Sequence, residues 1–293
     1  MPKNRQGTRK NRKKLPMRNL VIRTFSGIVY VGLIVVSLLW CPPLLLALSM
    51  FALYICLREF FAMAIGPTGF ESERLLAMVT AEALLVLVWC HCAYCMSPRY
   101  IPLGLIPLLG LWVAQIFSPK RFELERLSLI ACGLLYITVP FLLMPRMVYP
   151  MEEYYGGLLL SVFILVWFTD VGAYLVGTLL GQKPDSRKLA PEISPKKSWW
   201  GVIGGIVCGL LAAVLLYFTD ILRIPPAHCI GLAILVSLFA IFGDLFESLW
   251  KRHFGVKDSG RIIPGHGGML DRLDSMLFAQ MAAFLYLSIF NLI

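Results

Sequence analysis

The chain has 293 residues, of which 58% are hydrophobic and only 15% are charged. Soluble domains are about half apolar and a quarter charged, so this composition excludes an ordinary soluble enzyme and indicates an integral membrane protein. The net charge of +10 suits the cytoplasmic loops of such a protein, so we predict no nucleic-acid partner.

The N-terminal segment combines a basic stretch with an apolar run. Residues 1–19 carry eight lysines and arginines and no acid, which predicts a cytoplasmic tail held near anionic lipid headgroups. The run from Leu20 to Trp40 is too long for the apolar core of a signal peptide and lacks a small-residue cleavage site. We therefore interpret it as an uncleaved first span.

Long apolar segments follow one another to the C-terminus. They predict an all-α, polytopic transmembrane bundle of about nine spans, near 20–40, 44–65, 75–95, 101–117, 127–149, 156–181, 201–219, 226–250 and 270–292. We divide the chain into the basic tail (1–19), the N-terminal transmembrane spans (20–150) and a C-terminal transmembrane catalytic region (151–293).

The distribution of basic residues predicts the orientation. With the N-terminus in the cytoplasm, 22 of the 27 lysines and arginines fall in the tail or in cytoplasmic loops, if Arg272 is counted with the last loop. Lysine and arginine are enriched on the cytoplasmic side of membrane proteins. We expect a multi-pass protein of a bacterial inner membrane, with its N-terminus and active site in the cytoplasm.

Charged residues within spans are costly and mark functional candidates. Arg58, Glu59 and Glu82 lie in early spans, and we assign them structural roles. Asp170 lies in the sixth span, within a Thr-Asp-Val-Gly-Ala-Tyr sequence.

The eighth span carries Asp244, Glu247, Ser248 and Lys251, whose spacing places them on one helical face. An apolar bilayer cannot accommodate such a face, so it is expected to face a wet cavity or another polar helix.

The ninth span begins with Asp271 and Asp274, again on one face. Carboxylates that outnumber the nearby bases indicate a divalent cation. Oxygen ligands favour Mg²⁺, with Mn²⁺ as an alternative, and a second cation stays open. We expect Asp244, Asp271 and Asp274 to be the metal ligands.

Two loops are suited to holding phosphate. The glycine-rich segment 257–268 leads into the ninth span, where backbone N–H groups at a helix N-terminus favour anions. The segment 194–198 contributes two lysines and two serines before another helix start. Together with the carboxylates, these loops predict phosphoryl or nucleotidyl transfer between a cytosolic nucleotide and a lipid.

Residues 248–274 resemble the signature of the phosphatidate cytidylyltransferases, also called CDP-diacylglycerol synthases. The matching positions are Ser248, Lys251-Arg252, Lys257-Asp258, Gly260, Pro264, His266-Gly267-Gly268 and Asp271-Arg272-Leu273-Asp274. Blocks at 169–174 and 194–198 are also similar, so the resemblance covers about 165–275. It departs at Trp200, where an acid is usual.

The resemblance implies that CMP is transferred from CTP to phosphatidic acid, giving CDP-diacylglycerol and pyrophosphate. Catalytic roles fall to Asp244, Lys251, Asp271, Arg272 and Asp274. The expected substrate-binding residues are Asp170, Ser194, Lys196, Lys197, Ser198, Ser248, Arg252, Lys257, Asp258, His266, Gly267 and Gly268. The lipid bilayer is the other expected partner, and a homodimer stays an open alternative to a monomer.

Two other functions fit parts of the pattern. Another CTP-dependent lipid enzyme, such as a polyprenol kinase, would need a similar metal and phosphate site. A transporter could use carboxylates within the membrane, but no inverted repeat is evident and the charges cluster at span ends.

Overall fold

The structure is a computed structural model that describes residues 17–66, 70–117, 124–150, 153–260, 262 and 267–293. Most of the predicted basic tail therefore lies outside the described residues.

Helices account for almost all of the described chain. The helical elements are α1 (Met17–Trp40), α2 (Pro42–Ala64), α3 (Glu71–Tyr94), η1 (Pro98–Leu105), α4 (Ile106–Ile116), α5 (Leu124–Gly133), η2 (Leu134–Thr138), α6 (Val139–Val148), α7 (Gly157–Leu179), α8 (Trp199–Phe218), α9 (Pro226–His253) and α10 (Leu270–Ile289). Two short strands, β1 (Lys188–Ala190) and β2 (Ser194–Ser198), separate α7 from α8. The prediction of a helical bundle is thus confirmed.

Seven helical segments of the described chain are long and apolar enough to cross a membrane. They are α2, α3, η1 with α4, α5 through α6, α7, α8 and α9. The other two predicted spans correspond to α1 and α10. In α1 the apolar described stretch is the shorter Gly27–Trp40, and in α10 the charged residues of the first turns lower the hydropathy.

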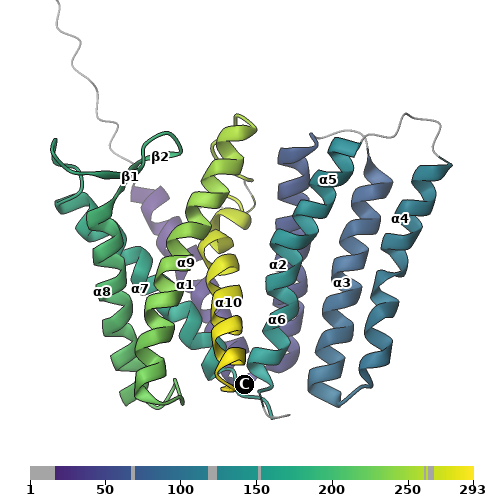
Figure 1. Cartoon of the computed structure of the whole chain (residues 1–293), viewed down its shortest axis with the longest axis horizontal. Coiled ribbons are helices and arrows are strands. Elements are labelled where there is room, and N and C mark those ends of the chain that lie inside the picture. Colours follow the sequence, from purple (N-terminus) through teal and green to yellow (C-terminus); the bar gives the residue numbers. More distant parts are fainter. Residues whose placement is uncertain (1–16, 67–69, 118–123, 151–152, 261, 263–266) are drawn as a thin grey trace, which may run out of the picture.

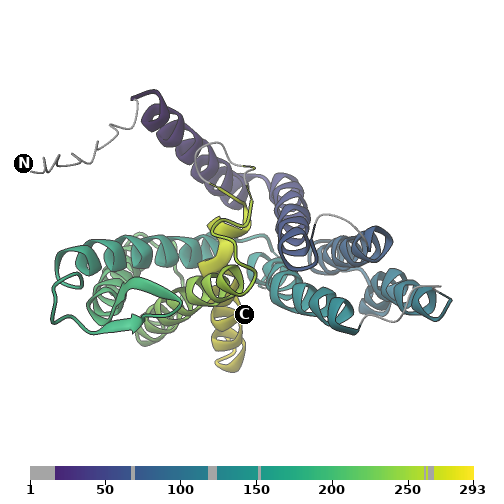
Figure 2. The same ribbon diagram turned by 90° about the horizontal axis from the view of Figure 1, so that it is seen from above.

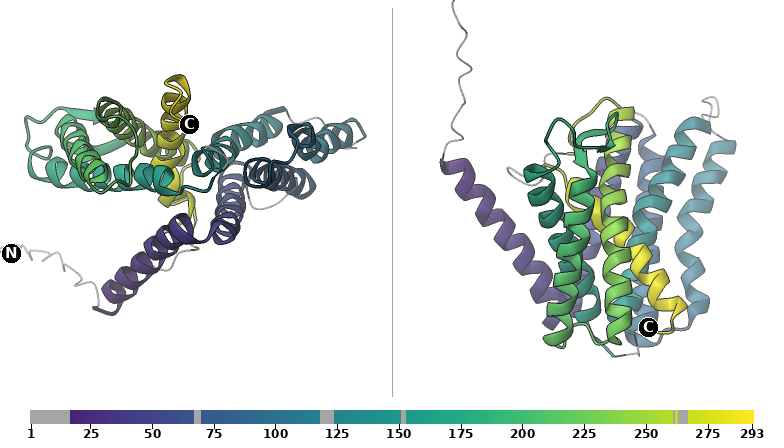
Figure 3. Two further views of the ribbon diagram at one scale, coloured as in Figure 1. Left: turned by 90° about the horizontal axis from the view of Figure 1, so that it is seen from below. Right: turned by 60° about the vertical axis from the view of Figure 1, so that its left-hand side comes forward.

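Helix α10 lies at the centre of the molecule, as Figures 1 and 2 show. The helices α7, α8 and α9 are grouped on one side of it, and α2 to α6 lie on the other. Helix α1 runs obliquely to the rest (Figure 3). Because α10 contacts α9 and α7 as well as α6 and α2, it joins the two halves of the chain.

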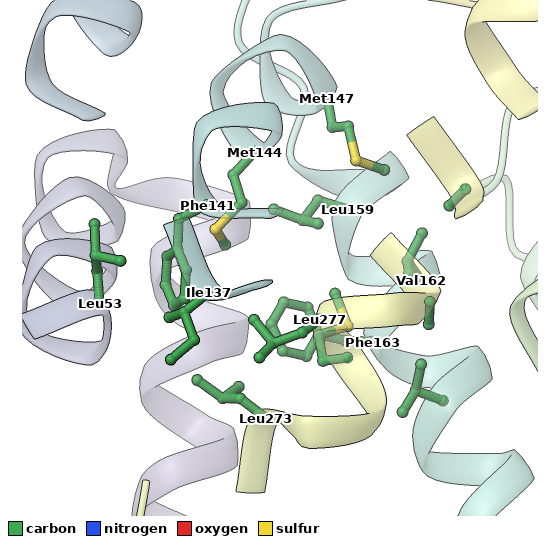
Figure 4. Close-up of a cluster of buried hydrophobic side chains, with 14 of the residues drawn as sticks. Leu53, Ile137, Phe141, Met144, Met147, Leu159, Val162, Phe163, Leu273 and Leu277 are labelled. Atoms are coloured by element: carbon green, nitrogen blue, oxygen red, sulfur yellow. The ribbon is translucent and has the colours of Figure 1, made fainter. Parts of the chain in front are cut away.

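An apolar core fixes α10 in this central position. Leu273 and Leu277 of α10 belong to this core. They lie near Ile137 of η2, Phe141 of α6 and Phe163 of α7 (Figure 4). The π-helical turn η2 ends two residues before Pro140. A proline ring clashes with the carbonyl of the residue four positions earlier, which explains a widened turn at this place.

Glycines allow α7 and α8 to pack closely. A side-chain carbon added at Gly172 would lie 2.5 Å from the carbonyl oxygen of Gly204, and one added at Gly204 would lie 2.4 Å from Val176. Small residues at such positions let membrane helices approach each other. These two glycines, one in α7 and one in α8, therefore serve the packing of the two helices.

Candidate active site

The polar face of α9 lies beside a cavity at one end of the bundle. Asp244 and Lys251 line the cavity. Ser248 donates a hydrogen bond to Asp244 Oδ1 over 3.4 Å, and Glu247 is fully buried in an ion pair with Lys251. The helical spacing thus places these four side chains on one polar face, as two contacting pairs.

The cavity has a volume of about 750 Å³ and is lined by α7, the β-hairpin, α8, α9, Asp258 and the start of α10. The hairpin and the C-terminal end of α9 lie at the same end of the molecule, at the top of Figure 1. Pockets for small organic ligands usually measure 300–1,000 Å³. The charged residues that line this one are Asp170, Lys196, Lys197, Asp244, Lys251, Asp258, Asp271, Arg272 and Asp274.

Three of these carboxylates come from different helices. Asp170 of α7, Asp244 of α9 and Asp274 of α10 are close enough to influence one another electrostatically. Lys197 Nζ lies 2.7 Å from Asp244 Oδ2. This contact places one lysine ammonium group beside the three carboxylates on this wall of the cavity.

Asp271 also lines the cavity, but its carboxylate is engaged by the loop before α10 and by Lys251. Its Oδ2 accepts hydrogen bonds from the backbone N–H groups of Ser259 and Gly268, each over 3.0 Å, and its Oδ1 lies 2.8 Å from Lys251 Nζ. Gly267 adopts φ +89°, a conformation that other residues rarely reach, and this turn brings the Gly268 N–H to the carboxylate. Asp271 therefore holds the glycine-rich loop against α10.

Lys251 links the two acids on either side of it. Its ammonium group contacts Glu247 of the same helix and Asp271 of α10. An ammonium group has three N–H donors, so these two contacts leave one for a ligand. Because Lys251 also lines the cavity, it can place a fixed positive charge there.

The hairpin between α7 and α8 positions Lys196 and Lys197. Its two strands are antiparallel, with Lys188 opposite Ser198. Gln182 donates a hydrogen bond of 2.8 Å to the carbonyl oxygen of Lys196. Ser198 is buried and caps α8 by accepting a hydrogen bond of 3.3 Å from the Gly201 N–H. The sequence predicts a plain loop here, because proline and lysine are depleted in strands, and the structure shows a short hairpin instead.

The structure brings most predicted site residues to this cavity, but not all of them. Arg252 and Lys257 are exposed, and they and Ser194 do not belong to the described lining. Ser248 acts through Asp244, and His266 lies outside the described residues. Tyr174, from the block at 169–174, also lines the cavity, together with Thr178 and Gln182, which carried no distinctive sequence signal.

No three histidine, cysteine, aspartate or glutamate side chains in the described ranges form a ready-made metal-binding group. The donor chemistry still suits Mg²⁺, which commonly uses one or two carboxylates and completes its shell with water and phosphate oxygens. Asp244 and Asp274, with Asp170 beside them, meet that requirement better than the predicted set, because Asp271 is engaged by Lys251 and the loop.

Comparison with known proteins relates this chain to cytidylyltransferases. Residues 21–290 match the cytidylyltransferase family. A Staphylococcus aureus protein named phosphatidate cytidylyltransferase is 42% identical over 166 residues, which cover 56% of this chain and 60% of the relative's length. A Bacillus subtilis protein of the same name is 36% identical over 189 residues, covering 64% of this chain and 68% of its own length.

Proposed function

Because the chain belongs to the cytidylyltransferase family, we propose that it transfers CMP from CTP to phosphatidic acid and releases CDP-diacylglycerol and pyrophosphate. One observation carries the proposal: lysines of the hairpin and of α9 line the same cavity as carboxylates of α7, α9 and α10. The cavity lies at the end of an apolar bundle. This position suits a reaction between CTP from the aqueous phase and a lipid from the membrane.

The reaction needs alignment more than proton transfer. An oxygen of the lipid phosphate attacks the α-phosphorus of CTP, and the bond from that phosphorus to the bridging oxygen of pyrophosphate breaks. A phosphomonoester is already mostly dianionic near pH 7, so it needs no strong general base. This explains a site composed of lysines, aspartates and glycine backbone. Fixed charges there orient the two phosphates and neutralise the charge that develops on the leaving group.

The residues divide into two groups. Lys196, Lys197, Lys251 and Arg272 would bind phosphate oxygens. Asp244 and Asp274, supported by Asp170, would hold Mg²⁺, which when bound supplies neutralisation of the triphosphate charge. Mn²⁺ could take the same oxygen ligands.

The activity can be tested on detergent-solubilised protein without any ion gradient. We expect pyrophosphate release to require both CTP and phosphatidic acid. Release of CDP in place of pyrophosphate would contradict the proposal in favour of a lipid kinase. A protein that consumes no CTP under these conditions would leave a transporter as the better hypothesis.

Replacing Lys197 by alanine is expected to weaken substrate use. The ammonium group lies 2.7 Å from Asp244, at the wall where the triphosphate would bind. A charge-assisted contact contributes on the order of 1.5–3 kcal/mol, so kcat/KM for CTP should fall roughly 10- to 150-fold. Lys183→Ala, an exposed lysine of the same connection, is the matched control. Kinetics equal to the wild type in Lys197→Ala would contradict this role. The lysine would then only reflect the enrichment of basic residues on the cytoplasmic side.

We further propose that the cavity opens to the cytoplasm, because basic residues concentrate at that end. In a variant without the eight native cysteines, Asp185→Cys in the α7–β1 connection should resist impermeant thiol reagents in intact cells. Ala227→Cys, at the opposite end of α9, should react. Both residues are exposed, so access depends on the side of the membrane. The reverse labelling pattern would overturn the orientation.

A further inference from the structure

Helix α2 carries one acid that reaches the glycine-rich loop. Glu59 is only 5% exposed, although it lies in a largely apolar span. Its Oε2 accepts a hydrogen bond of 3.1 Å from Ser259 Oγ and one of 2.9 Å from the backbone N–H of Leu270. A buried carboxylate is costly, so contacts of this kind mark a specific role for it.

The first contact leads directly to the candidate active site. Ser259 Oγ, which donates to Glu59, also accepts a hydrogen bond of 3.3 Å from the backbone N–H of Asp271. The Ser259 N–H in turn donates to Asp271 Oδ2, and Asp271 Oδ1 contacts Lys251. A continuous chain of hydrogen bonds thus joins Glu59 to Lys251, a cation that lines the cavity.

The second contact fixes the start of α10. The N–H of Leu270 is one of the first helical donors, which have no partner within their own helix. Glu59 accepts from it, and a negative charge at this position also interacts favourably with the helix dipole. The first two turns of α10 carry Asp271, Arg272 and Asp274, so the placement of the helix start sets the positions of these residues.

Glycines in the loop close directly onto Glu59. A side-chain carbon added at Gly260 would meet Oε1 at 2.1 Å, Cδ at 2.5 Å and Cγ at 3.0 Å, all of Glu59. One added at Gly268 would lie 2.6 Å from Glu59 Oε2 and 2.1 Å from Ser259 Oγ. The Glu59 side chain cannot move away without losing its two hydrogen bonds, so its presence requires glycine at position 260. At position 268, Ser259 and the backbone nitrogen of Gly260 crowd the added carbon as well.

We propose that Glu59 is a positioning residue for the reaction, acting through Ser259, Leu270 and Asp271 on the phosphate-binding loop and the start of α10. The inference rests on the proposed function for the meaning of the site. It makes the N-terminal half of the chain part of the catalytic machinery, because Glu59 and the loop lie about 200 residues apart in sequence.

A double-mutant cycle between Glu59 and Gly260 tests the proposal. Glu59→Ala and Gly260→Ala should each lower kcat/KM for CTP by on the order of 10–100-fold, because both displace the loop. Truncating Glu59 to alanine removes the three atoms that lie nearest to the new methyl group of Gly260→Ala. The second substitution should therefore add little, less than about threefold, in the Glu59→Ala background.

Two controls keep the result specific. Glu82 of α3, whose carboxylate has no hydrogen-bond partner among the described residues, is the matched acid. Glu82→Ala should leave the full effect of Gly260→Ala in place, since independent sites combine multiplicatively. Glu59→Gln keeps the volume and loses the charge. It should raise KM for CTP and speed tryptic cleavage after exposed Lys257, even if Glu59→Ala fails to fold.

The outcomes separate the two hypotheses. Failure of the wild type to form CDP-diacylglycerol would contradict the proposed function. The coupling between Glu59 and Gly260 could then still be measured from the unfolding midpoints of the single and double variants. Multiplicative effects of Glu59→Ala and Gly260→Ala would overturn the positioning role. Normal kcat, KM and tryptic cleavage in Glu59→Gln, with only a lower unfolding midpoint, would do the same and leave Glu59 as a packing residue.

Discussion

Replacing Asp244 or Asp274 by asparagine is expected to abolish turnover while the protein still folds. The amide keeps the size of the carboxylate and removes its charge, and Mg²⁺ strongly prefers charged oxygen ligands. Since charge neutralisation by a metal contributes several kcal/mol, the rate should fall by roughly three orders of magnitude. Pyrophosphate release under saturating CTP measures the loss. Asp220→Asn changes an exposed acid in the connection between α8 and α9 that does not line the cavity, so this control should keep its activity.

The metal itself can be followed without turnover. Added Mg²⁺ should raise the unfolding midpoint of the wild type, because a ligand that binds only the folded state stabilises it. EDTA should abolish the activity of the wild type, and added Mg²⁺ should restore that activity. Asp244→Asn and Asp274→Asn should show neither the shift nor the recovery. An unchanged Mg²⁺ shift together with near-normal product formation in both variants would show that these acids are structural.

Asp271→Asn is expected to be as damaging for a different reason. Both carboxylate oxygens of Asp271 accept from N–H donors, Lys251 on one side and the loop on the other. An amide has one accepting oxygen and one donating nitrogen, so it opposes donors on one side whichever way it turns. We expect kcat/KM for CTP to fall by at least about 100-fold as the loop and Lys251 lose their common anchor.

The Mg²⁺ response distinguishes this role from that of a ligand. Asp271→Asn should retain the rise in unfolding midpoint with Mg²⁺, whereas Asp274→Asn should lose it. If both variants lose it equally, Asp271 is a metal ligand, as the spacing of the aspartates alone had led us to expect.

Periodicity and composition predicted the helical framework well. The apolar runs correspond to the helices, and the spacing of Asp244, Ser248 and Lys251 placed them on one face of α9. These features are local, so a window of a few turns contains them. The β-hairpin was missed because it is short and is stabilised partly by side chains such as Lys188, which donates to the carbonyl of Gly181.

Local sequence patterns do not predict which distant segments come into contact. Asp271 looked equivalent to Asp274, since both lie at the start of one helix. Their difference depends on where Lys251, Ser259 and Gly268 come to lie in the fold. Glu59 looked like an isolated structural charge for the same reason, because its partners are supplied by the last helix and the loop before it.

The position of a radiolabel in the lipid product tests the central claim most directly. Purified protein would be given phosphatidic acid, Mg²⁺ and CTP labelled at either the α- or the γ-phosphate. If CMP is transferred, label from the α-phosphate enters the lipid and label from the γ-phosphate leaves as pyrophosphate. Lipid that carries the γ-label and not the α-label, with CDP released, would contradict the account and identify a kinase.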